Sequence, residues 1–223
     1  MATEVTESTT LIAVDTGDWP LYLATVRSRL QDISLPRLPT EEQLAAVGYA
    51  VVVPTEKPTG DVVTEAPPIE ENGKWYQSWT VRPYTQEELD AQLAEKKTSL
   101  LVDIQTLRTM TLEKGIPVDF GGTDGVQHVQ LRDGDRANLT SLNNRAKDWI
   151  ADGNVQQLAF ITEEDNAVTI TTEQALALTN AAYDKYVEII FHLNDLKKQV
   201  ISATELSALP TIPSEIEIDI TVL

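Results

Sequence analysis

The residue types that carry most enzymatic chemistry are scarce and scattered in this sequence. It contains no cysteine and only two histidines, His128 and His192, neither of which belongs to a motif with metal-ligand spacing. Without cysteine there are no disulfides, thiolate metal ligands or thiol nucleophiles. The sequence shows no phosphate-binding loop, dinucleotide fingerprint, G-x-S-x-G or H-E-x-x-H motif. We therefore expect neither an enzyme nor a cofactor, and no catalytic or metal-binding residue is predicted.

Three polar stretches contain residue types that are found in calcium or anion sites. "RDGD" at 132–135 and "EEDN" at 163–166 are rich in oxygen ligands, but neither has the twelve-residue spacing of an EF-hand calcium loop. "GGTDG" at 121–125 has backbone amides for an anion, yet no lysine or helix start follows directly. We interpret all three as turns or helix starts. A pair of carboxylates that hydrolyses glycosides stays an open alternative, because nothing in so acidic a chain singles out two of them.

Two tryptophans, Trp75 and Trp79, lie four residues apart in "GKWYQSWTV". On a strand this spacing places both rings on the same face. The pair then forms either the core of a small module or a platform on which sugar rings stack. We favour the core, because the N-terminal part of the chain has few other large apolar side chains.

Composition narrows the class of partner. The 223 residues carry a net charge of −18, and 42% of them are apolar, as expected of a folded chain. A polyanion repels nucleic-acid phosphates and anionic membranes, so we expect neither as a partner. No run of 18 apolar residues predicts a membrane span, and the start of the sequence lacks the features of a secretion signal.

Periodicity and breakers predict an α+β fold in four parts. Residues 1–84 hold eight of the eleven prolines and form a small module of short helices and strands, in which Thr40 and Gln43 make a capping box and Asn72-Gly73 a hairpin turn. Residues 85–114 form a connecting helix that ends at Gly115. Residues 115–207 form an α+β domain of two hairpins, turned at 121–125 and 163–166, and two helices, the second over about 172–202. Residues 208–223 form a tail whose strict alternation over 215–222 predicts a strand.

Apolar stripes on the predicted helix 85–114 and on the tail supply the candidate interaction residues. Two compact lobes have too little surface to cover a long helix and a free strand, so we expect neighbouring chains to cover them. The predicted partner-binding residues are Leu93, Leu100, Ile104, Leu107, Ile216, Ile218 and Ile220. Packing within the chain is the alternative for both elements.

The first part of the chain resembles a module of bacteriophage tail-fibre-associated proteins, including tail-fibre assembly proteins. The resemblance rests on "RSRLQDISLPRLPTEEQLAAVGYAVVVPTEKP" followed by "GKWYQSWTVRPYTQEEL", and it covers residues 19–93. The second part resembles a small α+β domain of uncharacterised function found at the C-termini of phage tail-associated proteins. Its marks are Gln130, Arg136, Asn138, Leu139, Asp165, Asn166, Thr171 and Leu196–Ala203, with a small shift of the last mark at Val200 and Ile201.

The two resemblances imply one setting and no catalytic roles. We predict a non-enzymatic structural component of a phage tail, made in the host cytoplasm and located in the virion. It would attach fibre or receptor-binding proteins, contact fibre or baseplate subunits, and form a homo-oligomer. The first alternative is a tail-fibre assembly chaperone. The second is a glycan-binding fibre-tip protein that uses Trp75 and Trp79.

Overall fold

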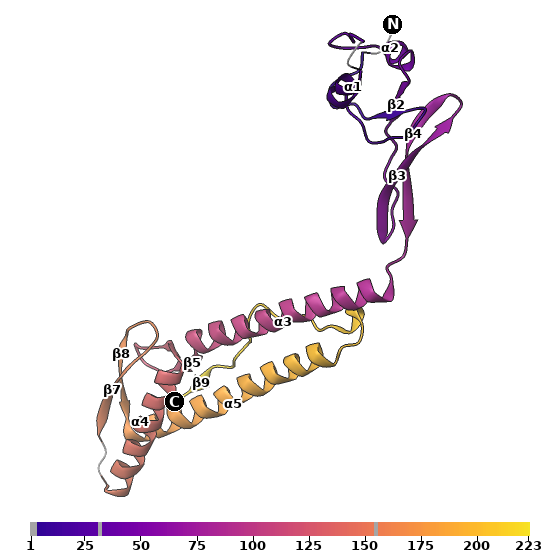
Figure 1. Cartoon of the computed structure of the whole chain (residues 1–223). Helices are drawn as coiled ribbons and strands as arrows, with labels where there is room; N and C mark the ends of the chain where they lie inside the picture. Colours follow the sequence, from indigo (N-terminus) through magenta and orange to yellow (C-terminus); the bar gives the residue numbers. More distant parts are fainter. Residues whose placement is uncertain (1–3, 31–32, 154–155) are drawn as a thin grey trace. The chain divides into compact units, whose positions relative to one another are not determined.

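A computed structural model describes residues 4–30, 33–153 and 156–223. It confirms the α+β class and divides the chain into two compact units, residues 1–86 and 87–223 (Figure 1). The N-terminal unit contains β1 (Leu11–Ala13), α1 (Leu23–Arg29), α2 (Glu41–Ala45), β2 (Tyr49–Val53), β3 (Val62–Glu71) and β4 (Lys74–Arg82). The C-terminal unit contains α3 (Gln86–Lys114), β5 (Ile116–Asp119), β6 (Val126–Val129), α4 (Asp133–Ala151), β7 (Gln157–Ile161), β8 (Ala167–Thr171), α5 (Thr172–Ser202), η1 (Leu206–Ala208) and β9 (Thr221–Val222).

The N-terminal unit is built on a four-stranded mixed sheet in the order β1-β2-β4-β3. The predicted turn between β3 and β4 is confirmed, since Asn72 and Gly73 have φ values of 52° and 75°. Two positive φ angles in a row are the signature of a type I′ hairpin turn, which asparagine and glycine tolerate best. The predicted capping box is also confirmed, because Thr40 and Gln43 exchange side-chain and backbone hydrogen bonds at the start of α2.

The core of the N-terminal unit is small and comes mostly from outside the β3–β4 hairpin. Its buried members are Val5, Leu11, Ala13, Leu21, Leu23, Val26, Leu44 and Tyr49. The tryptophans predicted to fill this core, Trp75 and Trp79, are half-buried and lie outside the cluster. Residues that precede β4 in the sequence, on β1, α1 and α2, supply the cluster instead.

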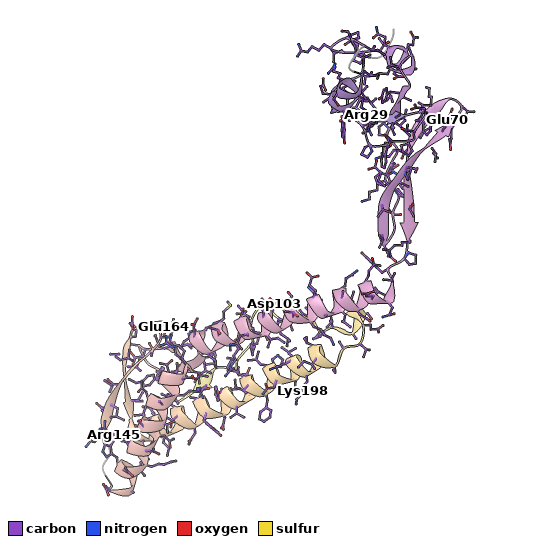
Figure 2. All side chains as sticks on the ribbon, in the orientation of Figure 1. Arg29, Glu70, Asp103, Arg145, Glu164 and Lys198 are labelled. Atoms are coloured by element: carbon purple, nitrogen blue, oxygen red, sulfur yellow. The ribbon has the colours of Figure 1, made fainter. Side chains whose placement is uncertain are left out.

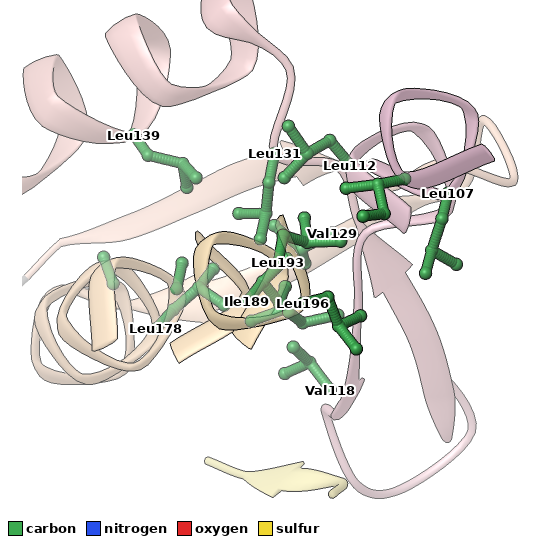
Figure 3. Close-up of a cluster of buried hydrophobic side chains, with 14 of the residues drawn as sticks. Leu107, Leu112, Val118, Val129, Leu131, Leu139, Leu178, Ile189, Leu193 and Leu196 are labelled. Atoms are coloured by element: carbon green, nitrogen blue, oxygen red, sulfur yellow. The ribbon is translucent and has the colours of Figure 1, made fainter. Parts of the chain in front are cut away.

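Helices α3 and α5 dominate the C-terminal unit, and their buried faces belong to one apolar cluster (Figure 3). The two helices are antiparallel neighbours, since the Lys97 ammonium of α3 donates to the Ile201 carbonyl near the end of α5 at 2.9 Å. Strands β5, β6 and β8 and helix α4 contribute further buried side chains. The helix predicted to connect two domains therefore lies inside the second unit, because its apolar face is needed for that unit's core.

A glycine fixes the junction of α3 and β5. Gly115 has a φ of 76°, and a Cβ at this position would lie 2.1 Å from the carbonyl oxygen of Val129. Only glycine allows the chain to pass so close to β6 with this backbone conformation. The sequence correctly predicts that α3 ends here.

The two hairpins of the C-terminal unit form where predicted. In β5–β6, the Phe120 amide donates to Gly125 across the 121–125 turn at 2.9 Å, and three of its glycines have positive φ. In β7–β8, the Thr162 amide donates to Asn166 at 3.0 Å across the 163–166 turn. The carboxylate of Asp135 accepts the Arg132 amide at 3.1 Å and so caps the start of α4. Helix α5 opens with a capping box of Thr171 and Gln174.

The C-terminal tail forms much less strand than its alternation predicts. Only Thr221–Val222 pairs with another strand, parallel to Val118 and Asp119 of β5. Ile216 and Ile218 pack against the unit's apolar cluster, whereas Ile220 is 55% exposed. Upstream of β9, residues 213–219 lie beside side chains of α3 and α5. The backbone groups of a helix already bond within the helix, so they cannot pair with the tail as a strand would.

Candidate functional site

The partner-binding residues predicted on α3 are largely covered by the chain itself. Leu100, Ile104 and Leu107 are only 7%, 7% and 4% exposed and belong to the central cluster. Leu93, nearer the start of the helix, is half-buried. The prediction of an intermolecular stripe is wrong for the three buried residues, because α5 and the tail provide the apolar surface that a second chain was expected to supply. The burial of these three residues also means that they do not support the predicted self-association.

The predicted interaction residues of the tail divide into two groups. Ile216 and Ile218 are half-buried and pack against the cluster of their own unit. Ile220 and Val222 stay exposed, at 55% and 76%. Over residues 215–223 the half-buried positions are Ile216 and Ile218, followed by Thr221 and Leu223. The alternation of half-buried and exposed side chains therefore shifts by one residue between Ile218 and Thr221.

The two tryptophans of β4 occupy one face of the sheet without entering the core. The Trp79 indole Nε1 donates to the Thr55 hydroxyl at 3.1 Å, and the Lys57 ammonium lies 5.8 Å from the centre of the ring. Trp75 pairs with Val52 of β2 and Glu70 of β3. The Trp79 ring is thus fixed by its neighbours, and both rings keep part of their surface in solvent.

The histidines have different surroundings. The His128 ring and its backbone amide both bind the Glu164 carboxylate, with an Nδ1–Oε1 distance of 2.8 Å. Glu164 is labelled in Figure 2. Burial acts to raise the pKa of Glu164, but its hydrogen bonds, first those from His128 and then those from its own backbone amide and Thr162, together outweigh burial, so that the pKa is lower than usual. This contact docks the β7–β8 turn onto β6. His192 is exposed on α5, beside tail residues 213–219.

A second apolar stripe on α5, which the sequence analysis missed, keeps part of its surface in solvent. We define the α5 outer stripe as Val187, Ile190 and Phe191. Phe191 is 65% exposed, and the other two are half-buried. The buried residues of α5 lie on the opposite face of the helix. The helical spacing of Val187, Ile190 and Phe191 was the signal in the sequence that could have found this stripe.

A cleft of the C-terminal unit lies between α4 and α5. This cleft, of about 620 Å³, is lined by Leu131, Arg136, Leu139, Thr140, Asn143, Thr179, Asn180, Ala182, Tyr183, Asp184 and Tyr186. Arg136 is one of the residues that carry the family resemblance. Leu139 is another. The lining residues come from separate helices and share no short motif that would bring them together in the sequence.

Stacking and ion pairing hold Arg136 at the cleft. Its guanidinium carbon lies 4.1 Å from the centre of the Tyr186 ring, within the range of a cation–π contact. Its Nη2 binds the carboxylate of Asp133, whose side chain is 94% exposed. Its Nε is buried and has no acceptor among the residues that the structure describes.

An amide links the two helices deeper along the cleft. The Asn143 amide on α4 donates to the Thr179 hydroxyl at 2.6 Å and to the Asn180 carbonyl oxygen at 3.3 Å. Thr179 is itself buried and also donates to the Leu176 carbonyl at 3.1 Å. The wall of the cleft is therefore a fixed polar surface rather than a set of mobile side chains.

Among residues 4–30, 33–153 and 156–223, no three histidine or acidic side chains gather as they do around a metal ion. Within that part of the chain, no helix has the length and apolar character needed to cross a bilayer.

Comparison with known proteins adds one match. Residues 95–222 match the model of a domain of unknown function, DUF4376. No curated protein and no solved structure matches the chain. The matched residues lie within the C-terminal unit, and the N-terminal unit falls outside the match.

Proposed function

The chain belongs to the DUF4376 family of domains of unknown function, and we propose that it is a structural component of a bacteriophage tail. In this proposal it is located in the virion after synthesis in the host cytoplasm. It joins a fibre or receptor-binding protein to the rest of the tail and catalyses no reaction. The choice of a phage tail rests on the two sequence resemblances described above.

The observation that carries an attachment role is the presence of two separate cores. Each unit has its own cluster of buried side chains, and the family domain accounts for the second unit alone. A chain of two independently packed modules is suited to holding one partner with each module, because neither module must unfold or rearrange when the other binds.

Each unit also retains exposed apolar side chains. In the N-terminal unit these include Ile69 and Val81 on the β3–β4 hairpin, which are 48% and 47% exposed. In the C-terminal unit the α5 outer stripe has the same character. Exposed apolar surface of this kind marks contact sites when it gathers on one face of a protein. We assign the fibre contact to the α5 outer stripe, because its three residues lie on one face of a single helix and Phe191 is more exposed than Ile69 or Val81.

The alternative is a tail-fibre assembly chaperone, which the N-terminal resemblance also supports. A chaperone binds the same fibre subunits but leaves before the particle is complete. The two functions therefore differ in whether the chain is retained, not in the surface that it uses.

Quantitative mass spectrometry of purified particles distinguishes them. For a structural component we expect peptides of this chain at a fixed ratio to the fibre subunits in every preparation. Peptides that are abundant in infected cells but absent from particles would favour the chaperone. If the chain neither enters particles nor increases the yield of soluble fibre on co-expression, both assignments are wrong.

A further inference from the structure

The α4–α5 cleft is a feature that an attachment role leaves unused. Its volume of about 620 Å³ falls in the range of small-molecule sites, which is about 300–1,000 Å³. Its wall combines apolar side chains with amides, hydroxyls and one ion of each sign. The composition of this wall indicates which class of ligand would bind there.

The charges of the cleft disfavour a charged ligand. Arg136 and Asp184 are its two ionised residues, so their formal charges cancel. Arg136 is already paired with Asp133 and stacked on Tyr186, so an anionic ligand would compete with the Asp133 carboxylate for its charge. A charged molecule would lose its hydration without gaining an unpaired partner.

The neutral groups suit a ligand whose polar atoms both donate and accept hydrogen bonds. The Asn143 amide hydrogens and the hydroxyl hydrogens of Thr140 and Thr179 bond within the wall. The side-chain oxygen of Asn143 can still accept a hydrogen bond, and the side-chain amide of Asn180 can still donate one. Alcohol hydroxyls can both donate and accept. A ligand with several hydroxyls on a rigid frame can use this surface at several points at once.

One aromatic ring of the cleft is free to receive the apolar face of such a ligand. Tyr186 is occupied by the Arg136 guanidinium, whereas Tyr183 is 68% exposed. A flat ring whose edge carries hydroxyls and whose face carries C–H groups can lie on an exposed tyrosine and bury apolar surface there.

We propose that the cleft between α4 and α5 binds a neutral sugar ring, with Tyr183 as the stacking platform and with Asn143, Asn180, Asp184 and Arg136 as hydrogen-bonding groups. The inference does not depend on the tail assignment. It places sugar recognition in the C-terminal unit rather than on Trp75 and Trp79.

The test uses the full chain and four neutral probes: glucose, galactose, mannose and N-acetylglucosamine. Glucuronate and glucosamine serve as anionic and cationic controls. We expect at least one neutral sugar to shift the side-chain amide NMR signals of Asn143 and Asn180, with a Kd on the order of 1–10 mM for a single ring. If no neutral sugar shifts these signals, or if only a charged control does, the proposal is wrong.

A pair of variants on one helix locates the binding. Tyr183→Ala should weaken the sugar about fivefold, since an aromatic contact is lost. Phe191→Ala removes an equally exposed ring eight positions further along α5, outside the cleft, and should leave the Kd unchanged. Equal effects of the two substitutions would overturn the assignment. Particle composition, which tests the tail assignment, does not enter this experiment.

Discussion

The Lys97 ammonium donates a hydrogen bond to the backbone carbonyl of Ile201 at 2.9 Å, across 104 positions of the sequence. The last carbonyls of a helix have no intrahelical donor, and a cation near this end also meets the negative end of the helix dipole. One side chain of α3 thus satisfies the end of α5 and fixes the alignment of the two long helices.

Removing this bond should destabilise the C-terminal unit. For Lys97→Met we expect a loss of about 0.5–1.5 kcal/mol in the free energy of unfolding, measured by urea denaturation. The adjacent Lys96 is exposed, so Lys96→Met should change the value by less than about 0.5 kcal/mol. Equal losses in the two variants would show that the Ile201 contact does not stabilise the fold.

The buried stripe of α3 gives a second prediction. Ile104→Ala leaves a cavity in the central cluster and should cost about 2–5 kcal/mol. Val102→Ala, two positions away and 61% exposed, should cost less than about 0.5 kcal/mol. If Ile104 were instead buried between chains, the loss would vary with protein concentration, whereas we expect it to be independent of concentration.

The tail provides a third test, with its own matched control. Ile216→Asp places a charge against the apolar cluster, so that the tail should detach and the unfolding free energy should fall by about 1–3 kcal/mol. Ile220→Asp lies on the exposed side and should change it by less than about 0.5 kcal/mol. Hydrogen exchange at Thr221 and Val222 reports detachment directly, since their pairing with β5 is lost. Unchanged exchange in the Ile216 variant would contradict this role of the tail.

The local features of this fold can be predicted from the sequence. The sequence does not show which surface covers each apolar helix face. The turn at Asn72-Gly73, the capping box of Thr40 and the stop at Gly115 follow from backbone chemistry within a few residues. The stripe of Leu100, Ile104 and Leu107 was also visible in the sequence, but periodicity is the same whether the covering surface belongs to the same chain or to another.

The residues of the candidate site are harder still to predict from the sequence. Arg136 and Tyr186 lie 50 positions apart, and Asn143 and Thr179 lie 36 apart, so no short motif brings them together. The Trp75–Trp79 pair had the clearer spacing, yet the core formed elsewhere because α1, α2 and β1 supply the required apolar volume.

A fourth prediction concerns pH. The pKa of Glu164 is lowered in the folded chain, so its pairing with His128 contributes stability above the unfolded pKa near 4.5, and this contribution is lost as the pH falls through the lower folded value. The carboxylate is about a third exposed and therefore screened, which limits the effect to less than about 1 kcal/mol. We expect Glu164→Gln to be less stable than the parent at pH 6 and to lose this part of the acid sensitivity. Identical pH profiles for the two proteins would contradict the assignment.

The last prediction tests the fibre contact assigned to the α5 outer stripe. Phe191 is 65% exposed, so Phe191→Asp should leave the unfolding free energy within about 0.5 kcal/mol of the parent while placing a charge in the proposed contact. Burying that charge against a partner without a counter-ion is unfavourable, and we expect incorporation into particles to fall at least tenfold. Tyr183→Asp, on the same helix but at the cleft, should be incorporated normally. Normal incorporation of the Phe191 variant would exclude this stripe as the fibre contact, and equal loss in both variants would show a general defect of α5 rather than a specific surface.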